Sequence, residues 1–327
     1  MSNRERKLRD DEVLRVWDLD VKFYTYAGVA HAVSGVSFYV REGETVALVG
    51  ETGCGKTVTT RAITRLIESP GRIEEGVALF RRRNGEVVDL LKLSDEEIRR
   101  IRGDEIAYIF QDPTSALDPL YTIGYHIVET IREHKREIKA AEALRKAVKL
   151  LRETAVPSPE VRVKNYPHEL SGGMRQRSVA AISLANSPRL LIADEPTTNL
   201  DVTIQAQILD LLKDLQRKYK MGLVLITHNL GIVAEMAERI YVMYAGKVVE
   251  EGRYDFVFYS PLHPYTQLLL RAVPNPLKKV ERLEFIPGVV PSLIDPPRGC
   301  RFHPRCPFAM EKCRVEEPSF IEVEKEH

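Results

Sequence analysis

Residues 50–57 carry the pattern with the most specific chemistry in this chain. They read G-x-x-x-x-G-K-S/T, as Gly50-Glu51-Thr52-Gly53-Cys54-Gly55-Lys56-Thr57. Glycines let backbone N–H groups turn inward around phosphate oxygens, and a following helix points its positive end at the same anion. In this pattern Lys56 reaches the β- and γ-phosphates, and Thr57 offers its hydroxyl to Mg²⁺. The segment predicts a nucleoside triphosphate site in which Cys54 is a small loop residue and not a nucleophile.

Two carboxylates close a later apolar segment. Residues 190–193 run directly into Asp194 and Glu195. A carboxylate at a strand end can hold Mg²⁺, directly or through water. The next carboxylate can polarise an attacking water as a general base. Paired acids at such a position also serve as helix caps, so the acids alone leave both interpretations open.

A Gly-rich segment lies between these two motifs, and it reads Leu170-Ser171-Gly172-Gly173-Met174-Arg175-Gln176-Arg177. With this segment the chain resembles the ATP-binding cassette (ABC) ATPases, whose signature is LSGG. The resemblance implies that two cassettes pack head to tail and that each signature faces the partner's nucleotide. A helix N-terminus would there point at a γ-phosphate. The residues implied for this contact in trans are Ser171, Gly172, Gly173 and Gln176.

The resemblance also assigns roles to residues that follow other strands. His228 ends the apolar run 223–227 and resembles the family's switch histidine, which contacts the γ-phosphate and helps to orient the attacking water. Gln111 resembles the Q-loop glutamine, expected to join Thr57 and Asp194 at Mg²⁺ and to signal to a membrane subunit. Catalysis is accordingly expected from Glu195, His228 and Gln111.

Residues 195–201 resemble the family's D-loop, which implies a role for Asp201. Asn199 stands where the family often has Ala. Adenine needs a flat partner, and Phe23, Tyr24 and Tyr26 are candidates. Position along the first strand favours Phe23 as the stacking residue, although an aromatic side chain in a strand is also commonly buried in the core.

The C-terminal part resembles the ATPases of oligopeptide and dipeptide permeases. The resemblance rests on residues 260–266 (SPLHPYT), residues 299–307 (GCRFHPRCP) and the Met of LSGGMRQR. Three cysteines, Cys300, Cys306 and Cys313, are spaced C-x5-C-x6-C. They suggest a soft-metal centre of zinc or iron–sulfur type, or three inert buried thiols. The subfamily implies a 4Fe–4S cluster, whose usual fourth cysteine this chain does not contain.

Composition excludes several other classes. The chain has 327 residues with 48 Lys and Arg against 47 Asp and Glu, which gives no basic excess for binding nucleic acid. No apolar run reaches the roughly 18 residues needed to cross a bilayer. The N-terminal residues 1–7 have no apolar segment behind them, so we expect no secretory signal. We expect a peripheral protein on the cytoplasmic face of the membrane.

Hydrophobic periodicity supplies the elements that position these motifs. Strands are expected at 13–24, 35–40, 45–49, 189–193 and 223–227. Hairpins are expected at 74–92, turning at Asn84-Gly85, and at 239–250, turning at Ala245-Gly246. Helices are expected at 57–67, 94–102 and 122–154. The Pro-rich composition beyond about residue 258 predicts a loop-rich appendage.

These features predict an α/β protein: a P-loop NTPase core of the ABC ATPase type with an antiparallel β subdomain around 74–106, a helical subdomain around 112–187 and a loop-rich C-terminal extension. The expected domains are an ATP-binding domain at 12–258 and the extension at 259–327.

The expected function is ATP hydrolysis that drives import of di- and oligopeptides, or of related solutes such as oligosaccharides. The implied partners are a second cassette (homo- or heterodimer), two transmembrane permeases and an extracytoplasmic solute-binding protein, with no nucleic acid. The alternatives are a soluble cassette ATPase acting on nucleic acid or ribosomes, and a metal-binding scaffold with a dead ATP site. The sequence contains neither a long heptad arm nor a second cassette, so it gives no support to the soluble cassette ATPase. The intact Lys56, Asp194, Glu195 and His228 argue against a dead ATP site.

Overall fold

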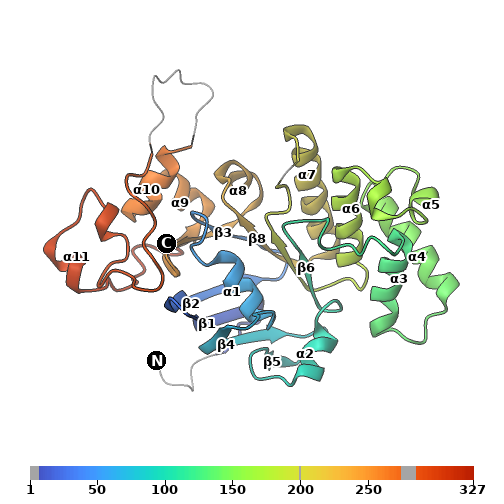
Figure 1. The fold of residues 1–327 in the computed structure, drawn as a ribbon, viewed down its shortest axis with the longest axis horizontal. Helices are drawn as coiled ribbons and strands as arrows, with labels where there is room; N and C mark the ends of the chain where they lie inside the picture. The colour runs from blue at the N-terminus through green and yellow to red at the C-terminus, as the bar shows by residue number, and fades with distance from the viewer. Residues whose placement is uncertain (1–6, 199, 274–284) are drawn as a thin grey trace.

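A computed structural model describes residues 7–198, 200–273 and 285–327. The segment 1–7, for which we expect no secretory signal, therefore lies largely outside the described residues, and so does Asn199. Figure 1 shows a central sheet region, with the helices α3 to α6 at one end of the molecule and the C-terminal segment around α10 and α11 at the other. Within the described residues, no helix has both the length and the apolar character required to span a bilayer.

A six-stranded sheet forms the centre of the molecule. Its five strands from β9 to β6 are parallel, and β10 adds an antiparallel edge through the predicted hairpin. The strands lie in the order β10 (Lys247–Arg253), β9 (Arg239–Tyr244), β3 (Thr45–Val49), β8 (Gly222–Thr227), β7 (Leu190–Asp194) and β6 (Ile106–Ile109). Every residue of β3, β7 and β8 is buried, as expected for parallel strands covered on both faces.

The antiparallel sheet is larger than predicted. Besides the expected hairpin it contains the two N-terminal strands, because β1 pairs with both β2 and β4. Its order is β2 (Gly28–Arg41), β1 (Glu12–Thr25), β4 (Gly71–Arg81) and β5 (Val87–Asp89). The following helix α2 (Asp95–Ile101) begins with the predicted capping box, in which Ser94 accepts from the Glu97 backbone N–H and Glu97 accepts from that of Ser94.

Two helix predictions were wrong in length. The helix after the phosphate loop, α1 (Lys56–Ile63), ends early because Arg65 adopts a left-handed backbone with φ of 53°. The segment predicted as one helix at 122–154 forms two, α3 (Ile123–His134) and α4 (Ala140–Glu153). The break lets the apolar faces of both helices enter the same core.

Three apolar clusters fix the layers. One packs α3, α4, α6 (Gly172–Ser183) and α7 (Val202–Tyr219) on one side of the parallel strands, and another packs α1 and the antiparallel sheet. The third lies beneath α8, α9 and α10 and includes Phe302 of the extension. The remaining helices are α5 (Pro159–Arg162), α8 (Leu230–Met236), α9 (Tyr254–Tyr259), α10 (Pro264–Arg271), α11 (Glu311–Val315) and the 3-10 turns Pro167–Glu169 and His303–Arg305.

Candidate nucleotide and catalytic site

The phosphate loop leaves β3 and enters α1 directly, as its sequence predicts. Gly50 has φ of 150°, and a Cβ added there would lie 2.1 Å from the carbonyl oxygen of Met243, so only glycine fits. The Lys56 ammonium donates to the carbonyl oxygens of Gly50, at 2.7 Å, and Glu51, at 3.1 Å. These bonds hold the buried lysine across the mouth of the loop, where phosphate oxygens would meet it.

Cys54 lies inside the same loop and is fully buried. Burial raises the pKa of its thiol, so the neutral form is favoured. A neutral, inaccessible thiol is a poor nucleophile. The geometry therefore agrees with a space-filling role for this residue.

Asp194 and Thr57 meet at the carboxyl end of the parallel strands. The Thr57 hydroxyl donates to Asp194 Oδ1 at 3.1 Å, and the Tyr108 hydroxyl donates to Oδ2 at 3.1 Å. Burial raises the pKa of the Asp194 carboxyl, and both hydrogen bonds oppose that rise. A hydroxyl and a carboxylate this close supply oxygen ligands of the kind Mg²⁺ prefers, so Thr57 and Asp194, two of the three predicted ligands, fit the ion.

Glu195 is the point where the predicted catalytic residues converge. His228 Nδ1 lies 3.0 Å from its Oε1, and Gln111 Nε2 donates to its Oε2 at 3.0 Å. Thr198 also donates to Oε2 at 3.0 Å. Partial burial alone would raise the pKa of this carboxyl, but the bonds from His228 and Thr198 outweigh it and lower the pKa. The carboxylate is therefore held ionised, as a proton acceptor needs to be. Gln111 contacts Glu195 and not Asp194.

Tyr108 and Thr198 were missed by sequence reasoning. Tyr108 lies in the short apolar strand β6, where a tyrosine is usually read as core. Its hydroxyl nevertheless joins Asp194 and lies 3.0 Å from that of Thr60. Thr198 lies three residues after Glu195, and only that short spacing hints that it can return to the carboxylate.

The signature segment lies apart from these residues, at the start of α6. Ser171 caps the helix by accepting from the Met174 N–H at 3.4 Å, and it is exposed together with Gly172. A surface hollow is lined by Ser171, both glycines and Asp201, which caps α7. Gln176 is 3 % exposed, so it does not reach this face, in contrast to its predicted contact in trans.

The candidate adenine partners differ in accessibility. Phe23, in β1, is half-buried because it packs against the core cluster of the antiparallel sheet, so part of its ring is covered. A Cβ added at Gly71 would lie 2.7 Å from the Phe23 ring. Tyr24 donates its hydroxyl to Glu74 at 2.8 Å. Tyr26, at the β1–β2 turn, is fully exposed.

The three C-terminal cysteines do not fit the predicted iron–sulfur cluster. Among the residues that the structure describes, no group of three or more His, Cys, Asp or Glu side chains is placed to hold a metal ion. Burial raises the pKa of the Cys300 and Cys306 thiols, so the metal-free thiols are neutral. Since the described residues offer no ligand group for a metal, we assign no part of the mechanism to a cluster.

A phosphate loop after a buried parallel strand, with paired carboxylates ending another strand of the same sheet, defines a P-loop nucleotide hydrolase. Residues 33–198 match the family model described as ABC transporter, and residues 249–313 match the C-terminal region of the oligopeptide/dipeptide transporter family. The chain belongs to the ABC transporter family as an ATP-binding cassette ATPase of the oligopeptide/dipeptide permease type.

The chain is also similar to individual proteins and to a solved structure of the same family. The chain is 48% identical to the probable peptide ABC transporter ATP-binding protein y4tR of Sinorhizobium fredii, over 97% of this chain and 93% of that protein. It is 49% identical to the dipeptide transport ATP-binding protein DppD of Escherichia coli K12, over 94% and 92%. The dimeric post-hydrolysis structure of the ATP-binding cassette MJ0796 with ADP and Pi has a TM-score of 0.65 and 26% identity, and the match covers 74% of this chain and 98% of that one.

Proposed function

We propose that this protein is the ATP-hydrolysing subunit of an importer for di- and oligopeptides or related solutes. The convergence of His228, Gln111 and Thr198 on the ionised Glu195 carboxylate carries the catalytic part. The names of the relatives and the match of residues 249–313 favour a peptide as the solute.

The proposed mechanism assigns one task to each group. Lys56, held over the phosphate loop, binds the β- and γ-phosphates of ATP by charge-assisted hydrogen bonds. Thr57 and Asp194 would hold Mg²⁺, and the ion would supply positive charge to neutralise the phosphates. Glu195 accepts the proton of the attacking water, while His228 and Gln111 orient its two oxygens.

The signature face acts on a second molecule. Ser171, Gly172 and Gly173 lie at the open N-terminus of α6, where an anion is favoured by the helix dipole. We place the γ-phosphate of a partner cassette there, with Asp201 on the same hollow. ATP would then hold two cassettes together, as a homo- or heterodimer.

The remaining partners follow from import across a membrane. Two transmembrane permeases would bind the cassettes on the cytoplasmic face, and an extracytoplasmic protein would deliver the solute. In this proposal residues 12–258 form the ATP-binding domain and residues 259–327 the extension. Tyr26, which exposes its whole ring, takes the adenine-stacking role in place of Phe23.

Reconstitution tests this function directly. The chain would be assembled with its permeases in liposomes, and uptake of a labelled dipeptide would be followed with and without the solute-binding protein and internal ATP. Uptake that needs ATP and the binding protein supports the proposal. ATP hydrolysis that responds to DNA or ribosomes, without uptake of any solute, would favour the soluble alternative.

A further inference from the structure

The C-terminal extension reaches back to the phosphate loop through Arg305. Its guanidinium donates to both carboxylate oxygens of Glu51, with Nη1–Oε2 at 2.7 Å and Nη2–Oε1 at 3.0 Å. Two parallel bonds of this kind are stronger and more directional than a single contact. Glu51 is the second residue of the loop and stands 254 positions from Arg305 in sequence.

The same arginine is fixed on its other sides. Its Nε donates to the carbonyl oxygen of Pro287 at 2.8 Å, and Nη1 also reaches the Tyr244 hydroxyl at 3.3 Å. The Arg305 side chain is 4 % exposed, against 28 % for Glu51. Arg305 is therefore held in place by several partners, whereas the Glu51 carboxylate is the more exposed member of the pair.

A second contact joins the extension to the loop backbone. The Glu51 N–H donates to the hydroxyl of Tyr265, a fully buried residue at the start of α10, at 3.0 Å. The Tyr265 ring packs on those of Tyr244 and Phe302, with centroids 4.6 and 5.3 Å away. Both the side chain and the backbone of Glu51 are thus held from residues beyond the cassette core.

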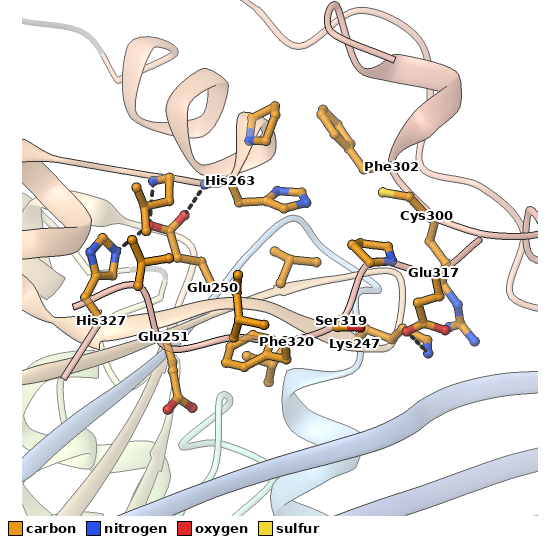
Figure 2. Close-up of a pocket in the computed structure, with 18 residues that line it drawn as sticks. Lys247, Glu250, Glu251, His263, Cys300, Phe302, Glu317, Ser319, Phe320 and His327 are labelled. Carbon is orange, nitrogen blue, oxygen red and sulfur yellow. Dashed lines mark hydrogen bonds and ion pairs between the residues drawn. The ribbon is translucent and has the colours of Figure 1, made fainter. Parts of the chain in front are cut away.

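Phe302 links this cluster to a separate cavity of about 260 Å³. Figure 2 shows Phe302 and Cys300 on one side of that cavity and the Lys247–Glu317 ion pair below them. The pair ties β10 to the extension without touching the phosphate loop. It is therefore a matched control for contacts of Arg305.

We propose that Arg305 and Tyr265 are positioning residues for ATP binding, because they hold Glu51 away from the phosphates. This inference rests on the proposed ATP site. A free carboxylate next to Gly50 would repel the triphosphate, since like charges at close range disfavour association. Arg305 neutralises that charge and fixes it, and Tyr265 fixes the adjoining backbone N–H. The extension thereby sets the affinity of the cassette for ATP.

A double-mutant cycle on the full chain tests the proposal. Arg305→Gln should raise the Kd for ATP about tenfold, because Glu51 is left unpaired beside the phosphates. In the Glu51→Gln background the same Arg305 change should alter the Kd by less than about twofold, since no carboxylate remains to be held. The effect should fall on KM, with kcat at saturating ATP changed much less. The Kd of Arg305→Lys for ATP should lie between those of the wild type and Arg305→Gln.

The controls separate this role from general support of the fold. Lys247→Gln, which breaks the other ion pair of the extension, should leave the Kd for ATP unchanged. Tyr265→Phe, which removes one hydroxyl, should raise it by a smaller factor than Arg305→Gln. Equal effects of Arg305→Gln with and without the Glu51→Gln change, or an unchanged Kd, would overturn the proposal. Wild-type protein that binds no ATP would instead reject the ATP site itself.

Discussion

The nucleotide site and the cysteine segment are built in opposite ways. At the nucleotide site, Gln111 and His228 contact Glu195 from two other segments of the chain, and all three residues follow strands of one sheet. In the segment 300–313, the arginines Arg301 and Arg305 bond to distant residues, but Cys300 and Cys313 are joined by a local backbone bond, from the Cys300 N–H to the Cys313 carbonyl at 2.9 Å. The ends of parallel strands bring together chemical groups from distant positions in the sequence. The loop 300–313, by contrast, buries Arg301 and Arg305. Among the described residues, its thiols do not form part of any group placed to hold a metal ion.

This difference predicts that substitutions at the nucleotide site strongly reduce ATP binding or turnover, and that substitutions of the cysteines change turnover little. The first test of the comparison is Ser171→Arg. Turnover of the assembled dimer should fall by about 10²-fold, because a bulky charge occupies the anion-binding end of α6. ATP binding by the isolated chain should not change. Binding by the monomer that falls as far as turnover would show that the signature acts within its own chain.

Lys56→Ala should weaken ATP binding itself. Loss of the buried Lys56 charge, which we propose binds the phosphates, should raise the Kd for ATP on the order of 30-fold. Isothermal titration with a non-hydrolysed ATP analogue measures this directly. An affinity like that of the wild type would refute the assignment of residues 50–57 as the phosphate loop.

Tyr26→Ala tests which aromatic residue of the nucleotide site stacks on adenine. Loss of a stacking ring should raise the Kd for ATP about fivefold or more. Tyr259→Ala, which removes an exposed ring from α9, is the matched control and should leave affinity unchanged. A larger loss of affinity with Phe23→Leu than with Tyr26→Ala would return the stacking role to Phe23.

Replacement of Cys300, Cys306 and Cys313 together by Ala should have the smallest effect. Basal ATP turnover should stay within about twofold of the wild type, because half-buried thiols act here as small apolar groups. A loss of turnover beyond tenfold, with the fold intact by circular dichroism, would mean that the thiols take part in the ATP cycle.

Sequence predicted the nucleotide site better than the contacts that support it. Glu195, Asp194 and His228 follow apolar strands, and parallel strands bring their ends to one edge, so these positions were predictable. Arg305 and Glu51 are 254 residues apart, and no local pattern marks such a pair. The break between α3 and α4 was missed for a similar reason. Residues 135–139 contain neither Gly nor Pro, and tertiary packing of both apolar faces decides the turn.

The catalytic assignment of Glu195 is the central claim, and ATP turnover by Glu195→Gln in the assembled complex tests it most directly. Glutamine keeps the size of the side chain and its contact with His228 but cannot accept the proton. The account predicts that turnover falls by about 10²- to 10⁴-fold at saturating ATP, the contribution of a general base. Turnover close to that of the wild type, from a variant that still binds ATP, would contradict it.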